Sequence, residues 1–128
     1  MGPCNPSVAL ASSGKADEVE WNRRLLGIEP SLLDGVTTAD DAARSKPCPD
    51  LFEAALAATG ATPDRAIAIG DSPWDALSAR RAGLRTLGLL SGGFAEEDLL
   101  SAGCVALYRD PADLLVRYAE SPLARGAP

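Results

Sequence analysis

Residues 70–75, GDSPWD, carry two aspartates directly after a buried apolar run. That run, RAIAI at residues 65–69, predicts a strand, and the small and polar residues after it predict a tight turn into a helix. Asp71 and Asp75 lie at this transition. Carboxylate oxygens are hard ligands of the kind that Mg²⁺ prefers, so the pair predicts a magnesium site.

Two earlier segments carry side chains suited to phosphate. Ser12 and Ser13 follow an apolar run and precede a predicted helix, where hydroxyls and loop amides form an anion site. Lys46 precedes Pro47, which holds the backbone there extended, and the lysine charge would balance that of phosphate. Hydroxyl groups, a lysine and carboxylate ligands for a cation together indicate chemistry on a phosphoryl group.

Each of these residues also has a simpler structural explanation. Ser12 or Ser13 would cap the helix that follows SSGK. Lys46 would be a solvated surface lysine. Asp71 would be the N-cap of the next helix, with Asp75 in its first turn, where negative charge is favoured. Taken singly, these explanations are the stronger ones, but the order and spacing of the residues favour a site.

The elements that must position these residues alternate between short apolar runs and helical patterns. Since strands and helices alternate, the chain is predicted to be an α/β protein with βαβ units and a mostly parallel sheet of about five strands. Ligands bind such sheets at the carboxyl ends of the strands, which places the three loops at one edge. Strands are predicted within 7–13, 35–40, 65–71, 84–92 and 104–110, and helices within 14–28, 45–63, 72–83, 94–103 and 111–121.

Composition excludes several classes of protein. The 128 residues suit one domain over 1–128, with 1–6 and 122–128 irregular. No apolar run approaches the roughly 18–20 residues of a membrane span. The net charge of −6 and the scattered arginines argue against nucleic acid. The absence of histidine excludes a histidine base, and 3 cysteines without a CxxC pair fit a reducing cytoplasm, the expected location.

Three segments, in their order, resemble the haloacid dehalogenase superfamily, and most closely its phosphoglycolate phosphatase and β-phosphoglucomutase-like branch. They are VALASSG at 8–14, SKPCPDLF at 45–52 and IAIGDSPWDALSARRAG at 67–83. The patterns KPxPDxF and GDSxxDxxxAxxAG are specific when they occur together in this order. The resemblance implies a Rossmann-like three-layer sandwich and Mg²⁺-dependent hydrolysis of phosphomonoesters among small phosphorylated metabolites.

The resemblance also assigns roles by position. Ser12 resembles the phosphate-binding residue of the family's second motif, and Ser13 would add its backbone N–H. Lys46 resembles the third-motif lysine, which neutralises phosphate and the nucleophile. Asp71 resembles a Mg²⁺ ligand of the fourth motif, and Asp75 resembles its partner in the inner or outer shell of the metal.

The sequence departs from the family at its first motif, DxDxT, whose first aspartate attacks phosphorus. No such motif precedes residue 7 or occurs elsewhere, and the helical cap is also missing. We therefore expect a truncated core domain that lacks the family's central first strand and cap. For such a chain to be catalytic, another aspartate must act as nucleophile, and Asp71, assisted by Lys46, is the candidate.

In the family, the missing strand lies between the strand that ends at Ser12 and the strand that ends at Asp71. Bare strand edges recruit partners. Either these two strands pair directly within a monomer, or two chains complete each other by strand pairing or exchange. We expect the second outcome, a homodimer.

Two functions remain open on the sequence. One is a shortened and weak Mg²⁺-dependent phosphatase. The alternative is a non-catalytic fragment that folds as an oligomer and at most binds phosphate or Mg²⁺. A receiver-type signalling domain shares the α/β plan but needs an acidic pair after its first strand, where this chain has VALASSG.

Overall fold

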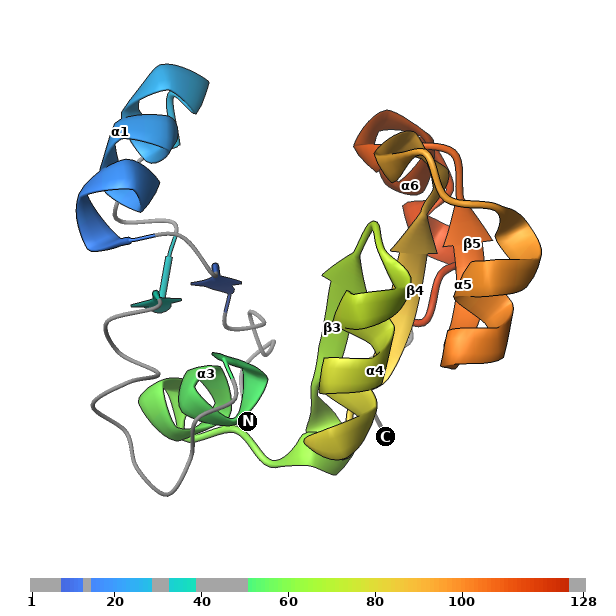
Figure 1. Cartoon of the computed structure of the whole chain (residues 1–128), viewed down its shortest axis with the longest axis horizontal. Coiled ribbons are helices and arrows are strands. Elements are labelled where there is room, and N and C mark those ends of the chain that lie inside the picture. The colour runs from blue at the N-terminus through green and yellow to red at the C-terminus, as the bar shows by residue number, and fades with distance from the viewer. Residues whose placement is uncertain (1–7, 13–14, 29–32, 39–50, 125–128) are drawn as a thin grey trace. The chain divides into compact units, whose positions relative to one another are not determined.

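The computed structural model of the chain describes residues 8–12, 15–28, 33–38 and 51–124. The chain divides into two compact units, Met1–Gly60 and Ala61–Pro128. Both units combine helices with parallel strands, and most of the longer elements are labelled in Figure 1. Each unit is described by itself below.

The first unit contains a two-stranded parallel sheet in which β1 pairs with β2. Helix α3 packs on this sheet, and a Cβ placed on Gly35 of β2 would lie 3.5 Å from the Thr59 methyl group of that helix. The start of the sheet is fixed by Asp34, whose Oδ2 accepts a 2.7 Å hydrogen bond from the N–H of Val8. The elements of this unit are β1 (Ala9–Ala11), α1 (Ala16–Leu26), β2 (Gly35–Thr37) and α3 (Leu51–Thr59).

Helix α1 ends as predicted but begins differently. Gly27 adopts φ 70° at the C-cap, a left-handed conformation that favours glycine. The N-cap residue is Lys15, whose own side chain makes no capping hydrogen bond. The expectation that Ser12 is the N-cap is therefore wrong, because the helix begins at Ala16, and Ser13 lies outside the described residues.

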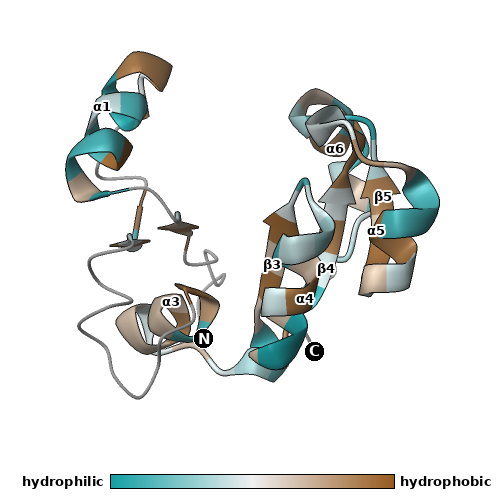
Figure 2. Cartoon of the chain, viewed as in Figure 1, coloured by the Kyte–Doolittle hydropathy of each residue, from teal (hydrophilic) through white to brown (hydrophobic). Residues whose placement is uncertain are grey.

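The second unit is a three-stranded parallel sheet of order β3-β4-β5 with helices on both faces. Apolar residues dominate its strands, whereas hydrophilic residues colour much of the outer helix surfaces (Figure 2). Its elements are η2 (Pro63–Arg65), β3 (Ile67–Gly70), α4 (Pro73–Arg81), β4 (Arg85–Leu89), η3 (Leu90–Gly92), α5 (Glu96–Ala102), β5 (Cys104–Tyr108), α6 (Pro111–Val116) and η4 (Tyr118–Glu120).

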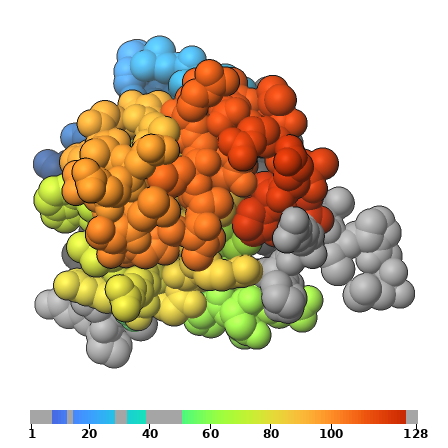
Figure 3. All heavy atoms as spheres, turned by 90° about the vertical axis from the view of Figure 1, so that its right-hand side faces the viewer, coloured from blue at the N-terminus to red at the C-terminus, as the bar shows by residue number. Residues whose placement is uncertain are grey.

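Two apolar clusters show that this unit has three layers. One joins α4 and α5 to β5, and the other joins α6 to β4 and β5 on the opposite face. Figure 3 shows the α5 residues and the α6–η4 residues on either side of the β5 edge. Buried members of the first cluster are Ala76, Leu99, Ala102 and Cys104, and those of the second are Leu87, Leu89, Tyr108 and Leu114.

The α/β class and the five parallel strands predicted from the sequence are confirmed among the described residues. The described strands lie in two parallel sheets, with β1 and β2 in one and β3, β4 and β5 in the other. One boundary differs from the prediction, because α6 ends at Val116 and a 3₁₀ turn follows, whereas the sequence predicts a helix within 111–121.

Other expectations stay predictions. The single domain over 1–128 is one of them, although Leu123, within the tail expected to be irregular, packs against the α6 cluster. The homodimer is another. Among the described helices, none has the length and apolar character needed to cross a membrane.

Candidate functional site

The turn between β3 and α4 is built by a reciprocal capping arrangement. Ser72 is the N-cap, and its hydroxyl accepts a 3.2 Å hydrogen bond from the N–H of Asp75. Pro73 occupies the first helical position, where its missing N–H is no loss. The expectation that Asp71 is the N-cap is wrong by one residue, because proline at 73 fixes the start of the helix.

The carboxylate of Asp75 folds back over this turn. Its Oδ2 accepts the backbone N–H groups of Asp71 at 3.1 Å and of Ser72 at 3.2 Å. This approach requires glycine at the end of β3, because a Cβ on Gly70 would lie only 2.5 Å from the Asp75 Cβ. The Oδ1 atom of Asp75 receives no hydrogen bond from the described part of the chain, so it is available to a ligand.

Asp71 is exposed, at the point where β3 ends. Within the described ranges, no side chain pairs with its carboxylate and no N–H donates to it. The turn after β4 approaches it closely, since a Cβ on Gly92 would lie 2.8 Å from both the Cβ and the Cγ of Asp71. The structure thus brings Asp71, Asp75 and Gly92 together at one end of the second unit's sheet.

These oxygens fit part of a Mg²⁺ shell. Magnesium is held in proteins by one or two carboxylates, with water and phosphate oxygens completing the octahedron. Asp71 offers a whole carboxylate, and Asp75 offers the oxygen that capping leaves unused. No cluster of three or more acidic, histidine or cysteine side chains that could hold a metal ion is found among the described residues.

Asp75 also acts on a buried thiol behind the turn. Burial, and after it the negative charge of Asp75, raises the pKa of the Cys104 thiol above its ordinary 9.0. Cys104 is 6% exposed and belongs to the cluster under α4 and α5. A buried thiol with a raised pKa is inert, so Cys104 is part of the core and not a nucleophile.

The predicted phosphate-binding residues lie either in the first unit or outside the described residues. Ser12 belongs to the first unit, where its N–H donates to the Thr37 carbonyl at 2.9 Å and extends the β1–β2 ladder. Ser13 and Lys46 lie outside the described residues. The roles of Ser12, Ser13 and Lys46 in phosphate binding therefore remain predictions.

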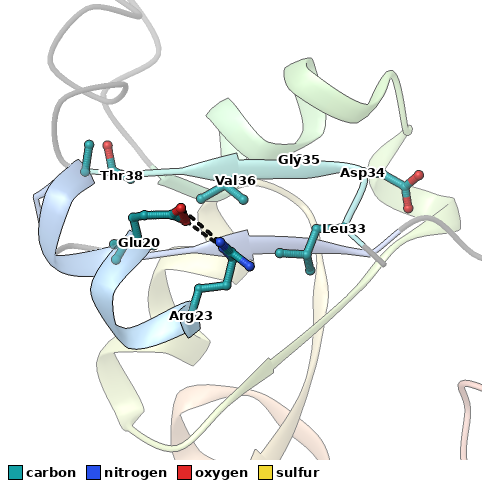
Figure 4. Close-up of a pocket in the computed structure, with 9 residues that line it drawn as sticks. Glu20, Arg23, Leu33, Asp34, Gly35, Val36 and Thr38 are labelled. Atoms are coloured by element: carbon teal, nitrogen blue, oxygen red, sulfur yellow. Dashed lines mark hydrogen bonds and ion pairs between the residues drawn. The ribbon is translucent and has the colours of Figure 1, made fainter. Parts of the chain in front are cut away.

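The first unit has a hollow of about 410 Å³ between α1 and β2 (Figure 4). Glu20 and Arg23 pair across 2.6 Å within it, and Arg23 also donates to the Ile28 carbonyl at 2.5 Å. Leu33 and Val36 form its apolar side. Since Glu20 and Arg23 pair with each other and the Asp34 carboxylate accepts the Val8 N–H, we assign this hollow no catalytic role.

Gly70 and Gly92 were not singled out by the sequence analysis. The sequence carries a signal for Gly70, because a small residue directly before Asp71 lets the start of helix α4 lie close to the end of strand β3. Gly92 had none, because its importance comes from a tertiary approach between two loops that are about 20 residues apart in the chain.

Comparison with known proteins agrees with the resemblance in the sequence. The haloacid dehalogenase-like hydrolase family model matches residues 5–83, more than half of the chain. The validoxylamine A 7'-phosphate phosphatase of Streptomyces hygroscopicus subsp. limoneus is 37% identical over 89 residues, covering 70% of this chain and 41% of that protein. The phosphoglycolate phosphatase of Rhodospirillum rubrum is 35% identical over 89 residues, covering 70% and 36%.

A solved structure gives the same answer for the fold. The crystal structure of a hydrolase from Pseudomonas syringae superposes with a TM-score of 0.76 at 40% identity, covering 88% of this chain and 52% of that one. The chain therefore spans less than half the length of these two curated relatives and about half of the solved structure. The family model and the shared fold together show that this chain belongs to the haloacid dehalogenase-like hydrolase family.

Proposed function

We propose that the chain functions in Mg²⁺-dependent hydrolysis of phosphomonoesters of small metabolites. The observation that carries this proposal is the pair of carboxylates at the end of β3. The carboxylate of Asp71 has no partner in the described residues, and the carboxylate of Asp75 keeps one free oxygen. Two relatives that are phosphatases by name, at 37% and 35% identity, support the same reaction class.

In this proposal Asp71 and Asp75 hold the cation. A bound Mg²⁺ supplies positive charge that neutralises phosphoryl oxygens as charge develops on them. Ser12 and the N–H of Ser13 bind the phosphate group, and Lys46 balances its charge. The capping hydrogen bonds to Asp75 hold its carboxylate in one orientation, so its free Oδ1 points in a fixed direction.

Hydrolysis by the chain alone also needs a nucleophile. Asp71 is the carboxylate free to attack phosphorus: its oxygen bonds to phosphorus, the ester oxygen leaves and takes a proton from water, and water then hydrolyses the acyl phosphate. The alternative function is binding of phosphate or Mg²⁺ without turnover.

The test is Mg²⁺-dependent phosphate release from a panel of phosphomonoesters, with the purified chain beside Asp71→Asn and Lys46→Ala. We expect release by the unaltered chain and its loss in both variants. Asp113→Asn, which removes the α6 carboxylate that corresponds to Asp75, is the control and should keep the activity. Release by Asp71→Asn at the unaltered rate contradicts the proposal, and no release by any protein favours the binding alternative.

We also propose a second copy of the chain as partner at the free side of β3. Among the described strands, β3 pairs only with β4, and Ile69 on β3 is 45% exposed. An apolar edge of this kind pairs with another strand. Light scattering after size-exclusion chromatography should show a dimer that Ile69→Lys shifts to monomer, whereas a monomer at every concentration refutes this partner.

A further inference from the structure

The turn after β4 packs against the same end of the sheet as the two aspartates. Strand β4 runs into the 3₁₀ turn η3, which closes when the N–H of Gly93 donates to the Leu90 carbonyl at 3.0 Å. Gly93 adopts φ 89°, a left-handed conformation that reverses the chain. The closed turn places Gly92 directly against Asp71.

The contact at Gly92 is specific for a residue without a side chain. A Cβ at this position would collide with the backbone carbonyl oxygen of Asp71 and lie 2.8 Å from its Cβ and Cγ. The backbone of Gly92 is not in the left-handed region, so its conformation alone does not demand glycine. Glycine is therefore required here by the closeness of Asp71.

A second, independent contact ties the same segment to the start of α4. The ring of Phe94 lies 5.8 Å, centroid to centroid, from the ring of Trp74, at an interplanar angle of 56°. Tilted aromatic pairs at this separation attract each other beyond the effect of the area they bury. Trp74 belongs to the first turn of α4, between the two aspartates in sequence. The segment from Leu90 to Phe94 thus contacts this turn at two residues, Asp71 and Trp74.

We propose that residues 90–94 form a positioning element for Asp71, with Gly92 as its contact point. The close approach of Gly92 limits the χ1 rotamers that the Asp71 side chain can adopt. The Trp74–Phe94 contact holds the turn at 90–94 in place. This inference rests on the proposed function insofar as Asp71 holds the cation. Its structural part, control of the Asp71 side chain, stands on geometry alone.

Supporting residues of this kind affect metal affinity without touching the metal. Loss of a group that orients a ligand weakens binding by about 10- to 100-fold. Gly92→Ala inserts one methyl group between the turn and Asp71, so the turn or the carboxylate must move. We expect Mn²⁺, used as a paramagnetic substitute for Mg²⁺, to bind the variant about 10-fold more weakly or worse.

The first measurement needs no metal. Side-chain coupling constants from NMR on the whole chain report the χ1 rotamer of Asp71. We expect one dominant rotamer in the unaltered chain and a different or averaged rotamer in Gly92→Ala. An unchanged rotamer in a folded Gly92→Ala chain overturns the inference, whether or not the chain binds a cation.

The second measurement is Mn²⁺ broadening of amide signals, titrated in the same samples. Ser101→Ala changes an exposed residue of α5, in the same unit but outside the turn, and should bind like the unaltered chain. Gly27→Ala strains a left-handed glycine that has nothing within 4 Å, in the other unit, and controls for general destabilisation. Equal Mn²⁺ affinity in Gly92→Ala and Ser101→Ala contradicts the inference.

Phe94→Ala is the second variant, for the case in which Gly92→Ala does not fold. It removes the aromatic anchor without a collision, so we expect averaging of the Asp71 rotamer and a smaller loss of Mn²⁺ affinity. An unchanged rotamer and affinity refute the positioning role of the segment. Failure of the unaltered chain to bind Mn²⁺ contradicts the proposed function instead, while the rotamer measurement still decides the inference.

Discussion

Two turns of the second unit share one design, and they differ at the residue that decides their chemistry. GDSPWD at 70–75 joins β3 to α4, and YRDPAD at 108–113 joins β5 to α6. In each turn a polar N-cap precedes a proline, and an aspartate stands at the third helical position. The carboxylate of that aspartate accepts a hydrogen bond from the backbone N–H of the residue four positions earlier, at 3.1 Å for Asp75 and 3.0 Å for Asp113.

The difference lies at the residue before the N-cap, which is Asp71 in one turn and Arg109 in the other. Arg117 and Arg109 pair with Asp113 at 3.5 and 3.9 Å, so the carboxylate at α6 is neutralised from within the chain. At α4, no described cation pairs with Asp71 or Asp75. The same capping arrangement therefore has its carboxylate paired with arginines at α6, whereas at α4 the carboxylates of Asp71 and Asp75 have no cationic partner among the described residues.

Exchange of the residue before the N-cap, Asp71, should have the largest effect on cation binding. Asp71→Arg gives the α4 turn the charge pattern of the α6 turn, and we expect the arginine to pair with Asp75 and abolish Mn²⁺ binding. Because an internal cation replaces the external one, the thermal stability should not fall. Calorimetric titration and melting of the same sample check both points, and retained Mn²⁺ binding would break the comparison.

The two N-caps should contribute equally to stability. Ser72→Ala and Asp110→Ala each remove the acceptor for the N–H at the third helical position, Asp75 or Asp113. Each substitution should lower the free energy of unfolding by about 1 kcal/mol. Urea denaturation measures both values, and a loss at only one turn would show that the two caps are not equivalent.

The sequence predicts the parts of this comparison that depend on local chemistry. Proline occupies the first helical position of both α4 and α6, so the start predicted at 111 is confirmed, whereas the start predicted at 72 is one residue too early. The assignment of the N-cap to Asp71 failed because aspartate and serine cap equally well. Pro73 at the first helical position was the signal that identifies Ser72.

Long-range features were not predictable in the same way. Strand pairing across the chain depends on which strand lies beside which, and apolar runs carry no such information. The close approach of Gly92 to Asp71 is likewise a property of the folded turn. The acidic pair was predicted from spacing, and in the structure the Asp75 carboxylate lies against the backbone N–H of Asp71.

The pH dependence of stability should also separate the two turns. The Arg109 N–H first, and then the charges of Arg117 and Arg109, hold the pKa of Asp113 below its ordinary 3.8. A lowered pKa in the fold adds stability above pH 3.8, and this is lost as the pH falls through the pKa of the folded state. Urea denaturation between pH 2 and about 6 should show a shallower acid decline for Asp113→Asn; an unchanged curve would contradict this cause.

The smallest effect concerns the thiol behind the α4 turn. Burial, and then the Asp75 charge, raises the Cys104 pKa, so the folded chain holds a neutral thiol where the unfolded chain ionises above pH 9.0. Stability should therefore decline as the pH rises past that value. In a chain with Cys4→Ser and Cys48→Ser, Asp75→Asn should lower the Cys104 pKa slightly. The pH profile of thiol alkylation measures it, and no shift would mean that the charge of Asp75 does not reach the thiol.

The central claim is that Asp71 and Asp75 form a divalent cation site that the corresponding residues of the α6 turn do not. Its most direct test is saturable Mg²⁺ binding, measured by competition with Mn²⁺, for the unaltered chain and for Asp71→Asn, Asp75→Asn and Asp113→Asn. We predict binding that is lost in the first two variants and unchanged in the third. Equal binding by all four proteins, or none by the unaltered chain, would contradict the claim.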